Sequence, residues 1–398
     1  MNFTLADVRD GLGPYLGIWL ITTYGWEAGA VGSVIGAAGI AGLLAKAPAG
    51  VIVDALPDKR IMLMGATIAI TLSCLLVLIS PAWGVVLASQ VLAAAAAAVV
   101  APAIAALTLG LVGPGGFSRR MGRNEAWNHG GNATTALAAG IAALWLGPVA
   151  VFIIMGVMAM LALLATATIP AAEVDARLAR GLAEGETGQG GWRLLMSRRP
   201  LLVLGISVAV FHFANAPMLP LVGQVLALED PGRATTLMSA CIVAAQLVMV
   251  GTAWVAGARA DAWGRKAIFL VGFAILPLRG VLYTVWDDPY WLVSVQLLDG
   301  IGAGMFGVLL PLMVADLSRG TGHFGAALGT MAVAQGFGGS LGNAVAGQVA
   351  QRGGYDAAFL MLAGIAAAGA AFFALAMRET RDATGPAPSL PPTAVQMG

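Results

Sequence analysis

The amino-acid sequence predicts an all-α polytopic membrane protein, with twelve transmembrane helices in two pseudo-symmetric six-helix bundles. Three observations support this fold class. Of the 398 residues, 59% are hydrophobic and only 10% are charged. Apolar runs of about 18 or more residues, long enough to cross a ~30 Å hydrocarbon core as helices, recur along the chain. A charged stretch of the first half also returns in the second half.

The first six expected helices precede residue 171, and each is delimited by polar or turn-forming residues. They cover residues 8–25, 29–55, 61–80, 83–112, 121–147 and 149–170. The breaks between them contain, in order, Trp26-Glu27, Asp58-Lys59-Arg60, Pro81, Arg119-Arg120 and Gly147-Pro148. Because the last break is so short, the fifth and sixth helices are expected to be joined almost directly.

The second six expected helices follow residue 199. They cover residues 200–226, 234–258, 266–286, 290–316, 324–350 and 355–377. The breaks contain Pro231-Gly232-Arg233, the charged stretch 259–265, Asp287-Asp288, Arg319-Gly320 and Arg352-Gly353. Prolines inside several spans are expected to kink them, which a bundle tolerates when neighbours satisfy the freed backbone groups.

The longest polar break divides the chain into domains. We expect an N-terminal six-helix bundle at 1–170, a cytoplasmic linker at 171–199, a C-terminal six-helix bundle at 200–378 and a disordered cytoplasmic tail at 379–398. The start of the linker is expected to form a short amphipathic helix, and its GETGQGG stretch is typical of a flexible connection.

The distribution of basic residues predicts the orientation. Seventeen of the 21 Lys and Arg residues, Arg9 among them, fall on one side of the expected membrane, and only Arg233 and Arg352 fall on the other. Such an excess marks the cytoplasmic side. We therefore expect both termini in the cytoplasm and the protein in the lipid bilayer of a cytoplasmic (inner) membrane, with a bacterial source.

The repeated charged stretch lies after the second and the eighth expected helix. Gly50 and Asp54 in GVIVDALPDKR correspond to Gly257 and Asp261 in GARADAWGRK. An internal repeat of half a membrane protein is typical of transporters whose binding site lies between the halves.

These residues resemble the signature of the major facilitator superfamily, and the resemblance extends over essentially the whole chain. The family pattern G-x-x-x-D-x-x-G-R-R/K is matched in full by Gly257, Asp261, Gly264, Arg265 and Lys266. The first copy keeps Gly50 and Asp54 but has Pro57-Asp58 where the family has Gly-Arg. The resemblance implies a twelve-helix secondary transporter that works by alternating access, with these seven residues closing the cytoplasmic face. The alternative for Asp54 and Asp261 is simple topogenic charge.

Charged residues inside the spans form two candidate pairs. Such residues are costly in a membrane and are usually paired or functional. Arg279 and Asp299 lie at nearly the same depth on consecutive helices, so an ion pair is expected, either as a structural support or as part of substrate binding or coupling. Asp10 and Lys46 both lie near the inner edge of the membrane, where they pair or line a cavity, or Lys46 snorkels to the surface.

The fifth expected helix carries the densest polar cluster. Glu125, Asn128, His129 and Asn132 are spaced i, i+3, i+4, i+7 and share one helical face, which is expected to point to protein or to a central cavity. Further candidates for substrate binding or coupling are His212 and Asn215 on the seventh helix and Gln335 and Asn343 on the eleventh. For each of them the alternative is a hydrogen-bonded structural residue.

The most favoured function is transport of a small organic solute, coupled to protons, with efflux favoured over uptake. Arg, Lys and amides suit an anionic or zwitterionic solute, whereas the apolar background suits an amphipathic drug. No P-loop, HExxH, Cys/His cluster or GxSxG occurs, so we expect no enzyme activity, no cofactor and no metal. The alternative is a non-transporting membrane sensor or an intramembrane enzyme. No nucleic-acid partner is expected, and the functional unit is expected to be a monomer.

Overall fold

The computed structural model describes residues 1–398 except 11, 13–15, 17–18, 21–22, 27, 183–197, 230–233 and 382–398. The described residues are almost entirely helical and include no strand, which confirms the all-α prediction. The first half contains α1 (Asn2–Asp10), α3 (Ala28–Ala55), α4 (Lys59–Ile79), α5 (Trp83–Ala97), α6 (Val100–Leu146) and α7 (Ala150–Ala167). The second half contains α9 (Arg199–Asn215), α10 (Met218–Glu229), α11 (Ala234–Trp263), α12 (Arg265–Leu282), α13 (Pro289–Ser318), α14 (Phe324–Gly353) and α15 (Tyr355–Ala376).

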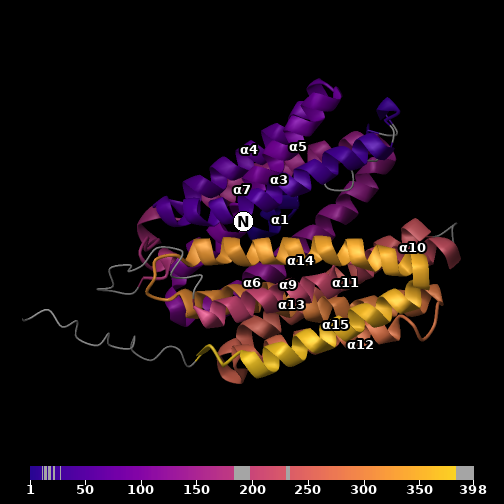
Figure 1. The fold of residues 1–398 in the computed structure, drawn as a ribbon. Helices are drawn as coiled ribbons and strands as arrows, with labels where there is room; N and C mark the ends of the chain where they lie inside the picture. The colour runs from indigo at the N-terminus through magenta and orange to yellow at the C-terminus, as the bar shows by residue number, and fades with distance from the viewer. Residues whose placement is uncertain are drawn as a thin grey trace, which may run out of the picture.

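The helices gather in two groups that follow the two halves of the chain. Figure 1 shows α3, α4, α5 and α7 on the upper side and α9, α12, α13, α14 and α15 on the lower side. Two long pairs join the groups, because α3 packs against α14 and α6 packs against α11. Any site between the halves is therefore framed by these four helices.

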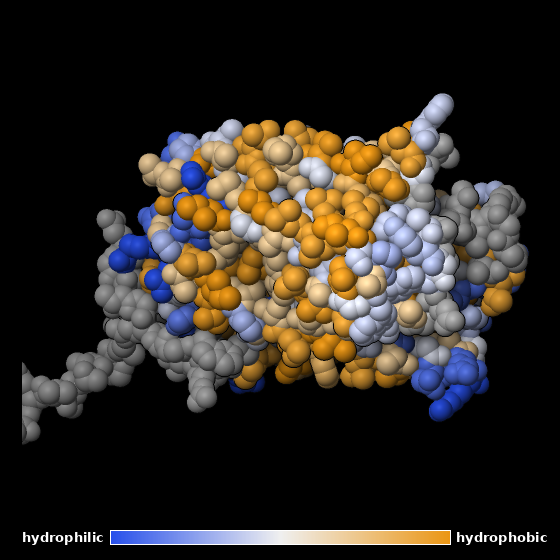
Figure 2. All heavy atoms as spheres, turned by 90° about the horizontal axis from the view of Figure 1, so that it is seen from above, coloured by the Kyte–Doolittle hydropathy of each residue, from blue (hydrophilic) through white to orange (hydrophobic). Residues whose placement is uncertain are grey.

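The surface has the pattern of a protein that sits in a bilayer. In Figure 2 hydrophobic residues form a belt across the middle of the visible face, and strongly hydrophilic residues gather toward its two ends. Leu375, Trp145 and Ile79 are 89%, 85% and 80% exposed, which would be costly in water. Eight of the described helical segments are long and apolar enough to cross a membrane. The count of twelve remains a prediction.

Several expected helices differ in detail from the observed ones. The expected span 83–112 covers α5 and the first part of α6, and the span 121–147 corresponds to the second part of α6. The chain turns between these two parts at Gly113, which has a φ of 62° and precedes Pro114. Asn124 Nδ2 donates to Thr108 Oγ1 at 2.9 Å, so the two parts of α6 lie side by side. The expected span 200–226 is broken before Pro217 into α9 and α10, because proline cannot continue the backbone hydrogen bonding.

Residues 171–182 of the linker contact both halves of the protein instead of forming the expected amphipathic helix. It contains two short 3-10 turns, Ala171–Glu173 and Leu178–Arg180. Asp175 N donates to Gly110 O of the first half at 3.0 Å, and Gly181 O accepts from Gly320 N of the second half at 2.8 Å. We call this end of the molecule the linker end. The GETGQGG stretch lies outside the described residues.

Candidate functional site

At the linker end the first charged stretch holds the facing half of the protein. Asp54, at the end of α3, is 4% exposed. Its two carboxylate oxygens accept from the backbone N–H groups of Gly325 and Ala326, both at 2.8 Å. These groups open α14, where the helix dipole also favours a negative charge. Asp54 therefore clamps the N-terminus of a second-half helix.

The residues that follow Asp54 explain how the first copy tolerates its departure from the pattern. Asp58 caps α4 by accepting from Arg60 N at 2.9 Å and Ile61 N at 3.2 Å. The ammonium group of the buried Lys59 donates hydrogen bonds to the carbonyls of Val53 and Leu56 at the end of α3. The two helix ends are thus satisfied by Asp58 and Lys59.

The second charged stretch forms a different contact across the halves. Asp261, at the end of α11, accepts from the Ser118 hydroxyl of α6 at 2.7 Å and lies 3.4 Å from Arg265. Its side chain is 53% exposed. Arg265 also pairs with Asp316 at 2.7 Å. We find that Asp261 binds a hydroxyl and an arginine of its own stretch, whereas the helix N-terminus is bound by Asp54.

The turn of the second stretch is locked by the start of the C-terminal tail. Gly264 has a φ of 84°, which lies in the left-handed region that favours glycine. Glu379 accepts from the backbone N–H groups of Arg265 at 2.9 Å and Lys266 at 3.1 Å, and thereby caps α12. Thr380 donates to Asp316 at 3.1 Å. The contacts of the C-terminal half thus include Glu379 and Thr380, past the expected boundary at residue 378.

Glycines bring the two halves into direct backbone contact at this end. A Cβ atom on Gly50 would overlap the carbonyl of Gly325, so α3 and α14 touch through their main chains. A Cβ atom on Gly122 of α6 would lie 2.6 Å from the Cα atom of Gly257 on α11. Side chains at these positions would force the helices apart, so both pairs need glycine to close.

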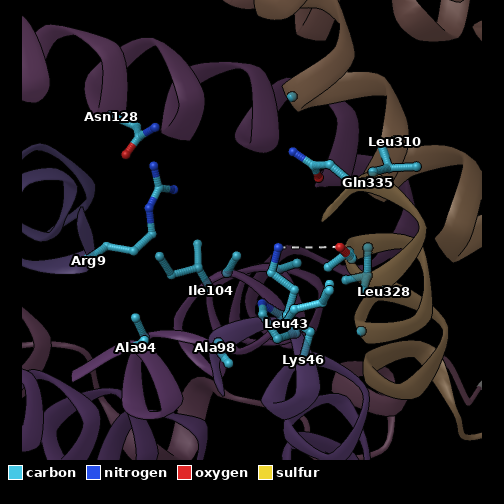
Figure 3. A pocket seen from close by; sticks show the side chains of 18 of the residues that line it. Arg9, Leu43, Lys46, Ala94, Ala98, Ile104, Asn128, Leu310, Leu328 and Gln335 are labelled. Atoms are coloured by element: carbon cyan, nitrogen blue, oxygen red, sulfur yellow. Dashed lines mark hydrogen bonds between the residues drawn. The ribbon is translucent and has the colours of Figure 1, made fainter. Parts of the chain in front are cut away.

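A cavity of about 950 Å³ lies between the halves beyond these contacts. Its walls come from α1, α3, α4, α5, α6, α13 and α14. Most of the lining is apolar and rich in alanine, and it includes Leu43, Ala94, Ala98, Ile104, Leu310 and Leu328 (Figure 3). Phe117 and Phe324 meet edge to face at the linker end, with ring centroids 6.0 Å apart.

Six polar residues from the two halves line this cavity in addition to Asn2. Figure 3 shows Arg9 of α1 pointing toward Asn128 of α6, and Gln335 of α14 on the facing wall. Asn128 Nδ2 lies 3.4 Å from Glu125 Oε2. Lys46 of α3 donates to the backbone carbonyl of Ala332 on α14 at 3.3 Å. Gln90 of α5 lies in the same wall.

The expected polar stripe of the fifth helix is divided between two surfaces. Glu125 and Asn128 line the cavity. His129 Nδ1 lies 2.7 Å from Gln246 Oε1, so this side chain faces α11. Asn132 is half-buried and is not among the described residues of the cavity wall.

The candidate ion pair of the second half is present. Arg279 is 1% exposed, and its guanidinium pairs with the carboxylate of Asp299. Asn215 Oδ1 accepts from Arg279 Nη2 at 2.9 Å, and Gln296 Nε2 donates to Asp299 at 3.1 Å. The network lies beside the break between α9 and α10. Within the described residues it lies outside the cavity wall.

The remaining candidates face their own helices or cannot be placed. His212 Nδ1 lies 3.1 Å from Val208 O, and its ring packs against Phe306. Asn343 Nδ2 donates to Gly339 O at 2.8 Å. The side chain of Asp10 is outside the described part of the structure, so its pairing with Lys46 remains a prediction. In the described residues no group of three or more His, Cys, Asp or Glu is arranged to hold a metal ion.

Sequence reasoning missed Arg9 as a cavity residue. We expected it on the cytoplasmic surface, but α1 already begins at Asn2 and packs against α6, which places Arg9 in the cavity wall. One signal was available, because Arg9 lay inside the expected span 8–25. Ser118, Asp316 and Glu379 were missed as partners of the second charged stretch, and their separation in sequence gave no signal.

Comparisons with known proteins agree with this architecture. A family model described as Major Facilitator Superfamily matches residues 1–280 and 244–395. An uncharacterised MFS-type transporter of Mycobacterium tuberculosis, present in strains H37Rv and CDC 1551, is 50% identical over 386 residues, which cover 96% of this chain and 92% of the relative.

Solved structures of similar fold cover nearly the whole chain. The human organic anion transporter MFSD10 has a TM-score of 0.71 at 16% identity, and the match covers 94% of this chain and 97% of that one. The proton:xylose symporter XylE has a TM-score of 0.74 at 14% identity, with coverages of 95% and 94%. FucP in its outward conformation has a TM-score of 0.75 at 13% identity, with coverages of 95% and 97%. At these identities the likeness shows the fold alone.

Proposed function

The chain belongs to the major facilitator superfamily, and from that premise we propose that it moves a small organic solute across the cytoplasmic membrane by alternating access, coupled to protons through Glu125. One observation carries the proposal. A cavity of about 950 Å³ lies between two halves that are clamped together at one end. The basic residues support placing that end, with both termini, in the cytoplasm.

The contacts between the halves support an outward-facing state. At the linker end α3 and α14 touch through Gly50 and Gly325. Toward the opposite end of α3, Gly36 and Gly39 have no described neighbour within 4 Å of a Cβ position, and Ile35 in the cavity wall is 48% exposed. Transport then requires the opposite arrangement, in which the clamps of Asp54 and Asp261 release.

The alternatives of another class have less support. A sensor would carry an output module, and the longest break between the expected spans is only the linker 171–199. An intramembrane enzyme built on a cysteine nucleophile, a histidine base or a metal cluster has less support, because the described cavity wall contains neither Cys nor His. Its alanine-rich lining suits a transported solute better than a reacting one.

Glu125 is our candidate for coupling because of its position. It is the one carboxylate among the described residues of the cavity wall. It forms no ion pair with Arg119 or Arg123 in the described part of the chain, so a purely anchoring role has no support. A Cβ atom on Gly307 of α13 would lie 3.5 Å from Glu125 Oε2. Glu125 thus lies between the halves, where its protonation can respond to both solute and conformation.

We expect Glu125→Gln to abolish proton-driven solute accumulation while solute exchange continues, because glutamine cannot release a proton. Proteoliposomes loaded with the pH dye pyranine would be tested with a panel of organic acids, amines and sugars. Wild type is expected to move protons when its solute is added, and the variant is expected to give no such signal. Exchange of the same radiolabelled solute should continue in the variant.

The control is His129→Gln, which changes a neighbouring residue that faces α11. Full proton-driven accumulation in both variants would eliminate this site as the coupler. The sign of the pyranine signal also tests the expected efflux. Exchange of solute for protons and joint movement of both give opposite changes of internal pH.

A further inference from the structure

We infer that the solute is an amphipathic organic anion with one negative charge, whose acidic group binds to Lys46 while its apolar body lies on the alanine-rich wall. The inference rests on the proposed function, because it names the chemical class carried by the same cavity. It goes beyond the family assignment, which leaves the solute open.

Lys46 has unused capacity to bind an anion. The chain has three lysines, and Lys59 and Lys266 are held by carbonyls at helix ends, the latter by Ala374 O at 2.7 Å. Lys46 lies in the interior of α3, and among the described residues only the Ala332 carbonyl, at 3.3 Å, accepts from it. An ammonium group has three donors, and a half-buried charge that has no counter-ion among the described residues is costly. An anion in the cavity would accept hydrogen bonds from Lys46 and would also balance its charge.

The other polar groups of the cavity are also suited to an acidic group. Arg9 supplies a second positive charge from the α1 side, and the amides of Gln90, Asn128 and Gln335 supply N–H donors. Against these stands one carboxylate among the described residues, that of Glu125. Lys46 and these amides therefore favour an acidic group, and the charge of Lys46 opposes an organic cation.

The size and composition of the cavity exclude a small inorganic anion as the best fit. About 950 Å³ is at the upper end of ligand pockets, which span ~300–1,000 Å³. Figure 3 shows the apolar lining residues Leu43, Ala94, Ala98 and Ile104 on the same side of the cavity as Lys46. A sugar would need many hydrogen bonds that such a surface lacks. A hydrocarbon or aromatic body with one acidic group uses both parts of the wall.

Glu125 links this solute class to protons. An ionised carboxylate in the cavity repels a bound anion, and its protonation removes that repulsion. Proton and anion would therefore bind together and cross in the same direction. Exchange of the anion for protons would instead require the two to exclude one another. The direction of proton movement relative to the solute therefore separates these two forms of coupling.

The experiment measures binding to the purified full-length protein. Three probes share one ring system: 2-naphthoate, the neutral 2-naphthamide and the cation 2-naphthylmethylammonium. A panel of ten aliphatic and aromatic carboxylates with their matched amines extends the set. Binding is measured by thermal shift and by equilibrium dialysis, neither of which requires transport. We expect carboxylates to bind better than their amides and amines.

Variants of the protein then test how Lys46 and Glu125 contribute to carboxylate binding. Lys46→Gln is expected to weaken carboxylate binding by roughly tenfold or more, because a charge-assisted hydrogen bond is lost, while Lys46→Arg keeps it. Glu125→Gln is expected to tighten binding, since it mimics the protonated form. Arg352→Gln, an exposed cation far from the cavity wall, is the matched control and should change nothing.

Preference for the amines, failure of every carboxylate in the panel, or an unchanged affinity in Lys46→Gln would each overturn the inference. If Lys46→Gln fails to fold, a weaker affinity in Glu125→Gln would overturn it independently. If the protein binds this solute class but is not a transporter, the result is different. Carboxylates then bind as described, but none crosses the membrane of proteoliposomes.

Discussion

Replacing Arg279 with alanine is expected to destabilise the folded protein by about 3–5 kcal/mol, the usual cost of removing one partner of a buried ion pair. Arg279 is 1% exposed and is bound by both Asp299 and Asn215. Its removal leaves the Asp299 carboxylate in the protein interior with Gln296 as its remaining described partner. Since whole domains are stable by only ~5–15 kcal/mol, we expect strongly reduced expression and a lower melting temperature.

Two further variants show whether loss of the ion pair between Arg279 and Asp299 causes the expected loss of stability. The double change Arg279→Ala with Asp299→Ala removes both charges and should recover part of the loss in melting temperature. Arg352→Ala at the exposed end of α14 controls for arginine loss as such and should melt like wild type. A harmless Arg279→Ala variant, or a double variant that is worse than either single one, would contradict the pairing as the source of the effect.

Replacing Gly50 with valine is expected to abolish transport by preventing closure of the linker end. A Cβ atom there overlaps the carbonyl of Gly325, so α3 and α14 must separate. Ala327, 1% exposed on α14, reports the separation. With cysteine at position 327, a thiol reagent added from the cytoplasmic side should label the Gly50→Val protein much faster than the parent.

The matched control is Gly36→Val, the same change on the same helix at a position with no described neighbour within 4 Å. Because this position is open in the present state, the variant should keep the slow labelling of position 327. Asp54→Asn offers an independent route to the same state, because a neutral amide loses charge-assisted bonds worth about 1.5–3 kcal/mol to the N-terminus of α14. Slow labelling of position 327 in both Gly50→Val and Asp54→Asn would contradict the closure role of this contact.

Much of the fold could be predicted because membrane helices are specified by local composition. The bounds of α3, α11, α13, α14 and α15 lie within a few residues of the expected ones, except for the far end of α11. That helix continues to Trp263 because the charged stretch stays helical until the left-handed Gly264. The ion pair of Arg279 and Asp299 was also predictable, since depth along two consecutive helices follows from the sequence alone.

The site was predicted only in part, because helical spacing does not decide between adjacent surfaces. Residues four apart differ by about 40° around a helix. Glu125 and His129 therefore share a stripe, yet one side chain faces the cavity and the other faces α11. Which of them lines the cavity depends on how α6 is rotated against α11. The close contact of Gly122 with Gly257 shows how tightly that packing is set.

The charged stretch that fits the family pattern better is also the one whose aspartate is less buried and bound by fewer groups of the other half. The copy that fits the family pattern in full places Asp261 on a half-exposed surface, whereas the degenerate copy buries Asp54 on two backbone N–H groups. The pattern records residue types, and it carries no information on the partner. Gly325 and Ala326 lie more than 270 residues away, so only the fold reveals them.

The central claim is that one cavity is opened in turn to the two sides of the membrane. Its most direct test is side-specific labelling of a cysteine at Ala98, in the cavity wall, with Cys74 and Cys241 replaced by alanine. An impermeant thiol reagent would be added to right-side-out and to inside-out vesicles. In the wild-type background we predict labelling from the outer side, and in the Asp54→Asn background labelling from the cytoplasmic side. Labelling from one and the same side in both backgrounds would contradict alternating access through this cavity.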